Sequence, residues 1–106
     1  MSSSQKFEQA FQNHKQGQLT KARDMYMEIL KDEPENAEVW DLLGVLYHQV
    51  NDYPESELCI KKALELSPRL YYLENLASLY LDKGDFERNM TDIPVPFGFK
   101  ESRGVL

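Results

Sequence analysis

The stretch Leu42-Leu43-Gly44-Val45-Leu46-Tyr47 decides the fold, because a similar stretch, Asn75-Leu76-Ala77-Ser78-Leu79-Tyr80, follows it 33 residues later. Leucine, a small residue, a second leucine and tyrosine recur in the same order. Residues 29–34 also match residues 63–68, at an offset of 34. A fixed period of this length indicates repeats that stack and share a core. We expect about two and a half copies, at about 3–36, 37–69 and 70–90, with the third incomplete.

Each copy contains two amphipathic helical patterns. In the middle copy, one face of the first helix carries, at i, i+3, i+4 spacing, Trp40, Leu43, Gly44, Tyr47 and Val50. The corresponding face of the second helix carries Leu58, Cys59, Lys62, Ala63 and Leu66. The predicted helices span 4–16, 20–32, 37–50, 53–66 and 70–83, with a short one from 86 to about 91. The fold is therefore expected to be all-α, built from antiparallel helix pairs.

Capping residues support these boundaries. Asn36 and Asp52 precede two of the helices and are good N-cap residues, and Pro54 suits the first turn. Asp85 is expected to cap the last short helix. Pro34 and Pro68 each end a helix, because the residue before proline avoids the α region.

The residues Trp40, Leu43-Gly44, Tyr47, Ala63 and Pro68 make the middle copy resemble the tetratricopeptide repeat. It departs from that pattern at Ser56 and Ile60. The first copy keeps Gly17, Ala22, Tyr26 and Pro34, and its first helix has the polar outer face of a terminal repeat, with Lys6, Gln9 and Asn13. The third copy keeps Leu73, Leu76, Ala77, Tyr80, Gly84 and Phe86 and stops matching at Asn89. The resemblance implies a short right-handed superhelix whose first helices line a concave groove.

The resemblance also implies that the groove binds a peptide or protein segment and performs no chemistry. The expected groove positions are those opposite the core face of each first helix. In the middle copy they are Glu38, Asp41, Val45, His48 and Gln49. In the third copy they are Tyr71, Glu74, Ser78, Leu81 and Asp82, and in the first copy Ser4, Phe7, Phe11, His14 and Lys15. Each residue alone is equally compatible with a solvated helix face, and Phe7 and Phe11 with packing against Ala22 and Tyr26.

Some members of the family hold acidic chaperone tails with a clamp of lysine, asparagine and arginine. The clamp positions here carry Phe7, Phe11, Leu42, Tyr71 and Asn75, and none of these is a base. Four carboxylates, on Glu38, Asp41, Glu74 and Asp82, instead predict a basic or apolar partner.

Composition excludes several other classes of function. The chain has 106 residues, and 18 acidic against 12 basic residues give a net charge of −6, which argues against a nucleic-acid binder. No apolar run is long enough for a transmembrane helix, and the polar start does not resemble a signal peptide. We therefore expect a cytoplasmic protein.

Catalytic and cofactor signals are weak. His14 and His48 lie one repeat apart and are expected to be neighbours in the groove, but nothing nearby completes a metal site. The single cysteine, Cys59, is interpreted as a small buried thiol. We expect no enzyme activity and no cofactor.

The segment 91–106 cannot continue a helix, because Pro94 and Pro96 interrupt it. It carries Ile93, Val95, Phe97 and Phe99 in alternation. The truncated third copy is expected to leave uncovered Leu73, Leu76, Leu79, Tyr80 and Phe86. Either the segment packs over them as a strap, or it is a frayed tail; two chains pairing at this end, as a homodimer, is the favoured alternative.

The leading function is an adaptor, or scaffold, for protein–protein interaction. Two alternatives remain: an accessory domain that positions the substrate of a larger enzyme, as in some glycosyltransferases, and a small chaperone for a secreted protein.

Overall fold

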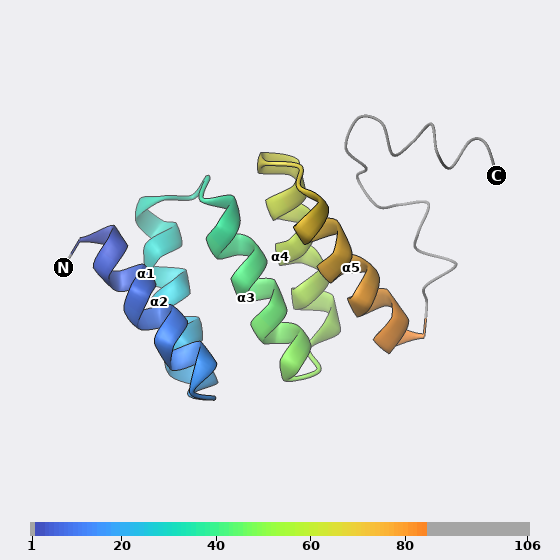
Figure 1. Ribbon diagram of the computed structural model, residues 1–106, viewed down its shortest axis with the longest axis horizontal. Helices are drawn as coiled ribbons and strands as arrows, with labels where there is room; N and C mark the ends of the chain where they lie inside the picture. Colours follow the sequence, from blue (N-terminus) through green and yellow to red (C-terminus); the bar gives the residue numbers. More distant parts are fainter. Residues whose placement is uncertain (1, 85–106) are drawn as a thin grey trace.

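The computed structural model describes residues 2–84, which form five α-helices connected by short turns. They are α1 (Ser3–Lys15), α2 (Leu19–Asp32), α3 (Ala37–Gln49), α4 (Tyr53–Leu66) and α5 (Leu70–Lys83). Figure 1 shows α1, α3 and α5 side by side in front, with α2 and α4 behind them. Each second helix packs between two first helices, and the described part of the chain contains no strand. The all-α fold of stacked helix pairs is confirmed.

The helix boundaries agree with the sequence prediction to within one residue, because the caps form. The Asn36 side chain accepts a hydrogen bond from the Val39 amide at 3.2 Å, and Asp52 accepts one from the Glu55 amide at 3.4 Å. Gly84 ends α5 in a left-handed conformation with φ of 83°, which glycine adopts without strain. The predicted short helix at 86–91 and its Asp85 cap lie outside the described residues.

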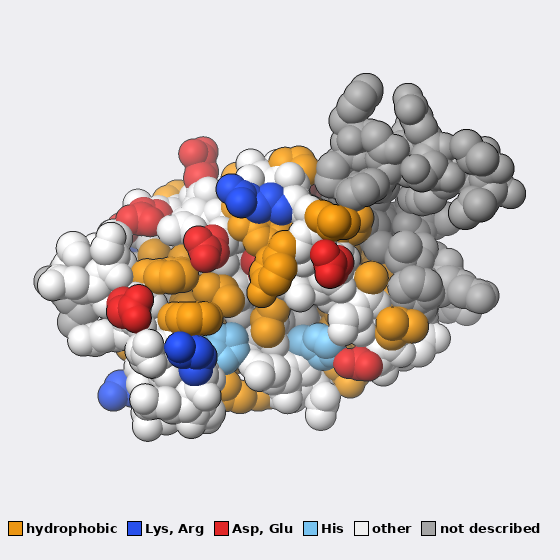
Figure 2. Space-filling model, viewed as in Figure 1, with side chains coloured by type: hydrophobic (Ala, Val, Ile, Leu, Met, Phe, Trp, Pro, Cys, Tyr) orange, Lys and Arg blue, Asp and Glu red, His pale blue; other side chains and the backbone are white. Residues whose placement is uncertain are grey.

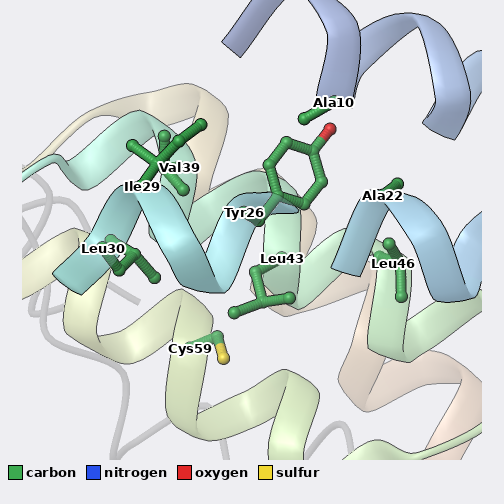
Figure 3. Packing of buried hydrophobic residues seen from close by; sticks show 9 residues of the cluster. All are labelled: Ala10, Ala22, Tyr26, Ile29, Leu30, Val39, Leu43, Leu46 and Cys59. Carbon is green, nitrogen blue, oxygen red and sulfur yellow. The ribbon is translucent and has the colours of Figure 1, made fainter. Parts of the chain in front are cut away.

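Two hydrophobic clusters form the core. The first joins α1, α2, α3 and α4, and Figure 3 shows the Tyr26 ring with its hydroxyl end toward Ala10 of α1. The second joins α3, α4 and α5 around Ile60 and Leu64. Trp40 packs against both clusters, so α3 carries the core across the boundary between helix pairs.

Gly44 lies where α3 and α4 approach each other closely. A β-carbon built at this position would lie 2.5 Å from Ile60 Cγ1 and 3.1 Å from the Ser56 carbonyl oxygen. The Ser56 hydroxyl donates a hydrogen bond of 2.6 Å to the Gly44 carbonyl. Serine at this position is therefore a buried polar link between the two helices.

Two predicted core residues are in fact exposed. Val50 follows the end of α3 and is 48% exposed, and Leu58 is 59% exposed. The buried face of α4 consists of Ser56, Cys59, Ile60, Ala63 and Leu64. This stripe has full i, i+3, i+4 spacing, so Leu58 lies on its outer flank.

The expectation that the end of the third copy is uncovered is wrong for three residues. Leu76, Leu79 and Tyr80 are fully buried in the second cluster, because Ile60, Ala63 and Leu64 of α4 pack against α5. Leu73 is half-buried against the same cluster, and Phe86 lies outside the described residues. The large exposed apolar side chains of α5 are instead Leu70, Tyr71 and Leu81. Within residues 2–84, none of the helices is both long enough and apolar enough to span a bilayer.

Candidate functional site

The residues predicted for the groove belong to α1, α3 and α5, whose shared surface we call the first-helix face (Figure 2). In that view hydrophobic side chains gather over α1 and between α3 and α5, with acidic side chains around them. The predicted residues that are exposed are Ser4, Lys15, Glu38, Gln49, Tyr71, Glu74, Ser78, Leu81 and Asp82. Half-buried are Phe7, Phe11, Val45 and His48, whereas His14 and Asp41 are buried.

Two stacked aromatic rings dominate the α1 part of the face. The Phe7 and Phe11 rings are nearly parallel, 9° apart, with centroids separated by 6.2 Å. Phe7 also packs on the first core cluster, which contains Ala22 and Tyr26. The Lys15 ammonium lies 5.0 Å from the centroid of the Phe11 ring. Phe7 therefore belongs partly to the core and partly to the surface. The Phe11 ring already forms a cation–π contact with Lys15.

A cleft of about 380 Å³, the N-terminal cleft, lies between the start of α1 and the start of α3. It is lined by Ser3, Ser4, Phe7, Glu8, Glu33, Asn36 and Glu38. Hydrogen bonds from Ser3 and Asn36 lower the pKa of Glu33, which keeps this carboxylate ionised. The cleft thus combines one aromatic ring with three carboxylates and has no lysine or arginine among its lining residues.

A second cleft, the C-terminal cleft, lies between the start of α3 and the start of α5 and has a volume of about 500 Å³. It is lined by Glu35, Asn36, Ala37, Glu38, Ser67, Arg69, Tyr71 and Tyr72. The Tyr71 and Tyr72 rings meet edge to face at 6.2 Å, and Tyr71 is 60% exposed. Glu38 and Asn36 line both clefts, so the two are adjacent across the first turn of α3.

Asp41 is not an exposed groove charge, contrary to the sequence prediction. Its carboxylate is 1% exposed and accepts two hydrogen bonds, of 3.0 and 3.1 Å, from the amide of Asn75 on α5. Burial raises its pKa to about 6, the Asn75 hydrogen bond opposes this, and the nearby Glu38 adds to it. Asp41 therefore joins α3 to α5 and offers little to a ligand.

The two histidines link successive first helices and do not form a site together. His14 is buried, and its ring bonds the Tyr26 hydroxyl at 2.9 Å and the Gln49 side-chain oxygen at 2.5 Å. His48 bonds Asp82 at 2.5 Å. Because Gln49 and Asp82 occupy equivalent positions, each histidine contacts the next first helix in the same way. These pairs fix the spacing of α1, α3 and α5.

Other reactive groups are protected. Cys59 is buried, and burial raises the pKa of its thiol to about 12, which disfavours the nucleophilic thiolate. No cluster of three metal-binding side chains occurs within residues 2–84. In the same range, every buried side-chain nitrogen and oxygen has a hydrogen-bond partner.

The sequence prediction missed the charged residues that come from the turns. Glu33, Glu35 and Arg69 line the clefts, yet they lie between helices, where helical periodicity assigns no face. The link between Asp41 and Asn75 was detectable in principle, because the two residues are one repeat length, 34 residues, apart. Of the positions compared with the acidic-tail clamp, Leu42 packs on the first cluster and the Asn75 amide is engaged by Asp41.

Comparison with known families fits this geometry. A family model described as a tetratricopeptide repeat matches residues 37–70, which contain α3, α4 and the turn that follows them. The helix pair at residues 37–70 therefore belongs to the tetratricopeptide-repeat family. Such repeats are protein–protein interaction modules and are typically non-catalytic. No curated protein sequence matches the chain significantly.

Proposed function

We propose that this tetratricopeptide-repeat protein is an adaptor that binds a protein segment on its first-helix face. The segment would carry apolar side chains next to lysine or arginine. The observation that supports this most directly is the position of Glu38, where two clefts meet that have Phe7 on one side and Tyr71 on the other. We also propose a cytoplasmic location, where the thiol of Cys59 stays reduced.

The aromatic rings supply the apolar half of the proposed recognition. Phe7, Phe11 and Tyr71 present flat surfaces that are only partly covered. Aromatic side chains give large contact areas and little flexibility, which favours them at binding sites. A segment crossing from α1 to α5 would contact all three.

The carboxylates supply the charged half. Glu8, Glu33 and Glu38 line the N-terminal cleft, and Glu74 is exposed one turn from Tyr71. A lysine or arginine bound here would gain from opposite charges and from the aromatic faces beside them. Asp82 contributes less, because His48 already engages its carboxylate.

The test uses a panel of short peptides with constant apolar residues and either lysine or glutamate beside them. We expect the wild-type protein to prefer the lysine peptides, and Glu38→Lys to weaken that binding by about tenfold, or about 1.4 kcal/mol. The wild-type preference should decrease with added salt, because the charges are partly exposed.

The matched control is Glu65→Lys, which makes the same charge change at an exposed position of α4. It should leave the affinity for the lysine peptides unchanged. Equal losses for Glu38→Lys and Glu65→Lys, or a preference for the glutamate peptides, would contradict the proposal.

A further inference from the structure

The chain itself contains a segment with the chemistry proposed for the partner. Residues 95–100 read Val95-Pro96-Phe97-Gly98-Phe99-Lys100 and so combine two phenylalanines with a lysine. They lie outside the described residues. The relevant site is the C-terminal cleft, which borders α5.

The segment is long enough to reach this cleft from its own chain. Tyr71 and Tyr72 are at the start of α5, and its 14 residues make the helix about 21 Å long. After Gly84, a chain that turns back must therefore cover about 21 Å. The ten residues 85–94 span at most about 33 Å when extended. Because Pro94 and Pro96 interrupt helical sequence here, an extended segment is what the sequence predicts at the end of this path.

Charge and shape favour this cleft for the segment. Glu35 and Glu38 line it, and Glu74 follows Tyr71 by one turn, so the carboxylates outnumber the one lining base, Arg69. Arg69 also donates a hydrogen bond of 3.4 Å to the Ser67 hydroxyl. A phenylalanine of the segment could pack on the exposed Tyr71 ring while its lysine lies near the carboxylates. The segment would then complement both the apolar and the acidic residues that line the cleft.

We propose that residues 95–100 occupy the C-terminal cleft of their own chain and compete there with a partner segment. The effect on partner binding rests on the proposed function, whereas the docking of the segment does not require a partner. A short tether gives the segment a millimolar effective concentration, which favours its own cleft over that of a second copy at ordinary protein concentrations. The segment would then act as a built-in competitor that only a tighter-binding partner displaces.

The direct test compares backbone amide NMR spectra of the intact wild-type chain and of the intact Phe97→Ser/Phe99→Ser variant. We expect shifts at Glu38, Tyr71 and Tyr72, and none at Lys62 and Glu65 on the outer side of α4. The differences should be the same at low and high protein concentration. Unchanged cleft amides, shifts confined to α4, or a concentration-dependent difference indicating a second copy would each overturn the proposal.

A second measurement adds a synthetic peptide of residues 91–106 to the same full-length variant. The peptide should shift the same cleft amides at a 1:1 ratio, and the effect should be lost when Glu38→Lys is added to the variant. Failure of the peptide to move these amides would also overturn the docking.

The consequence for partner binding is measured separately with the lysine peptides of the panel. Phe97→Ser/Phe99→Ser should raise the affinity for them by about tenfold, because the internal competitor is removed; an unchanged affinity would refute competition. If the panel peptides bind no variant while the segment still moves the cleft amides, the proposed partner chemistry fails and the docking stands.

Discussion

Asp41 lies on α3, but its side chain is buried rather than exposed to solvent. Its carboxylate is fully buried between α3 and α5, and the donor that faces it is the amide of Asn75. Of the groups near it, Glu38 on its own helix is acidic, and Tyr72 on α5 is buried with a hydroxyl whose pKa is raised by burial, so neither supplies a positive charge. A buried carboxylate with a neutral partner is costly when ionised, which is why its pKa is raised to about 6.

The raised pKa predicts the pH dependence of stability. The folded protein holds this proton more tightly than the unfolded chain, so the free energy of unfolding falls as pH rises from about 4 to about 6. A difference of about two pKa units corresponds to at most about 3 kcal/mol lost by neutral pH. Asp41→Asn should remove this dependence and stabilise the protein at pH 7, measured by urea unfolding at several pH values.

The control for that experiment is Asp24→Asn, at an exposed carboxylate of α2, which should keep the wild-type pH profile. Below about pH 4.5 a second group, Glu57, also affects the free energy of unfolding. Burial raises the pKa of Glu57, but hydrogen bonds from Lys61, Lys83 and Tyr80 outweigh this and lower it to about 2. Its stabilisation is therefore lost as pH falls from about 4.5 toward 2. A wild-type stability that rises steadily from pH 4 to 7 would show that Asp41 is not buried as a charge.

Gly44 gives a second prediction at the level of one residue. Because a β-carbon there would lie 2.5 Å from Ile60 Cγ1, Gly44→Leu must push α4 away from α3. We expect a loss of about 3 kcal/mol or more, at the upper end of overpacking costs, in thermal or urea unfolding. Ser78→Leu adds a leucine at an exposed position of α5 and should change stability little. A melting curve of Gly44→Leu identical to that of the wild type would contradict the close packing of α3 on α4 at this position.

At the scale of single helices, the stability of α4 should depend on the N-cap at its first turn. The Asp52 side chain caps it, whereas Gln18 at the start of α2 makes no such bond. We expect Asp52→Ala to lower the unfolding free energy by about 1 kcal/mol and Gln18→Ala to leave it nearly unchanged. Equal effects of the two substitutions in urea unfolding would argue against the cap.

The helices were predictable because their signals are local. Proline, asparagine, aspartate and glycine at the turns set each boundary, and a helix start or stop depends on few neighbours. Burial was harder, since α4 has two overlapping apolar stripes and only packing against α5 selects the one with Ile60 and Leu64. Leu58 was assigned to the core for this reason.

The site was only partly predictable for a related physical cause. Helical periodicity placed Glu38, Tyr71 and Phe7 on one face, and each of them lines at least one of the two clefts. It could not show that Asp41 and His14 turn into the contacts between helices, because side-chain partners 34 or 35 residues away are set by stacking. The clefts also depend on turn residues, whose directions follow from no repeating pattern.

At the scale of the whole molecule, the sequence left a choice between a strap and a dimer at the α5 end. Docking of residues 95–100 in their own chain predicts a monomer, although Leu70 and Leu81 are exposed on α5. Light scattering over a wide range of concentration should therefore give the mass of one chain. A constant dimer mass that Leu81→Lys reduces to a monomer would instead show that α5 pairs two chains.

If the first-helix face binds a segment through opposite charge at Glu38, exchanging the charges on the protein and the peptide should exchange the preferred partner. Affinities are measured for wild type and Glu38→Lys, each with the lysine and the glutamate form of one panel peptide. The preference should reverse, so that Glu38→Lys binds the glutamate peptide more tightly than wild type does. The same order of affinities in both proteins would contradict it.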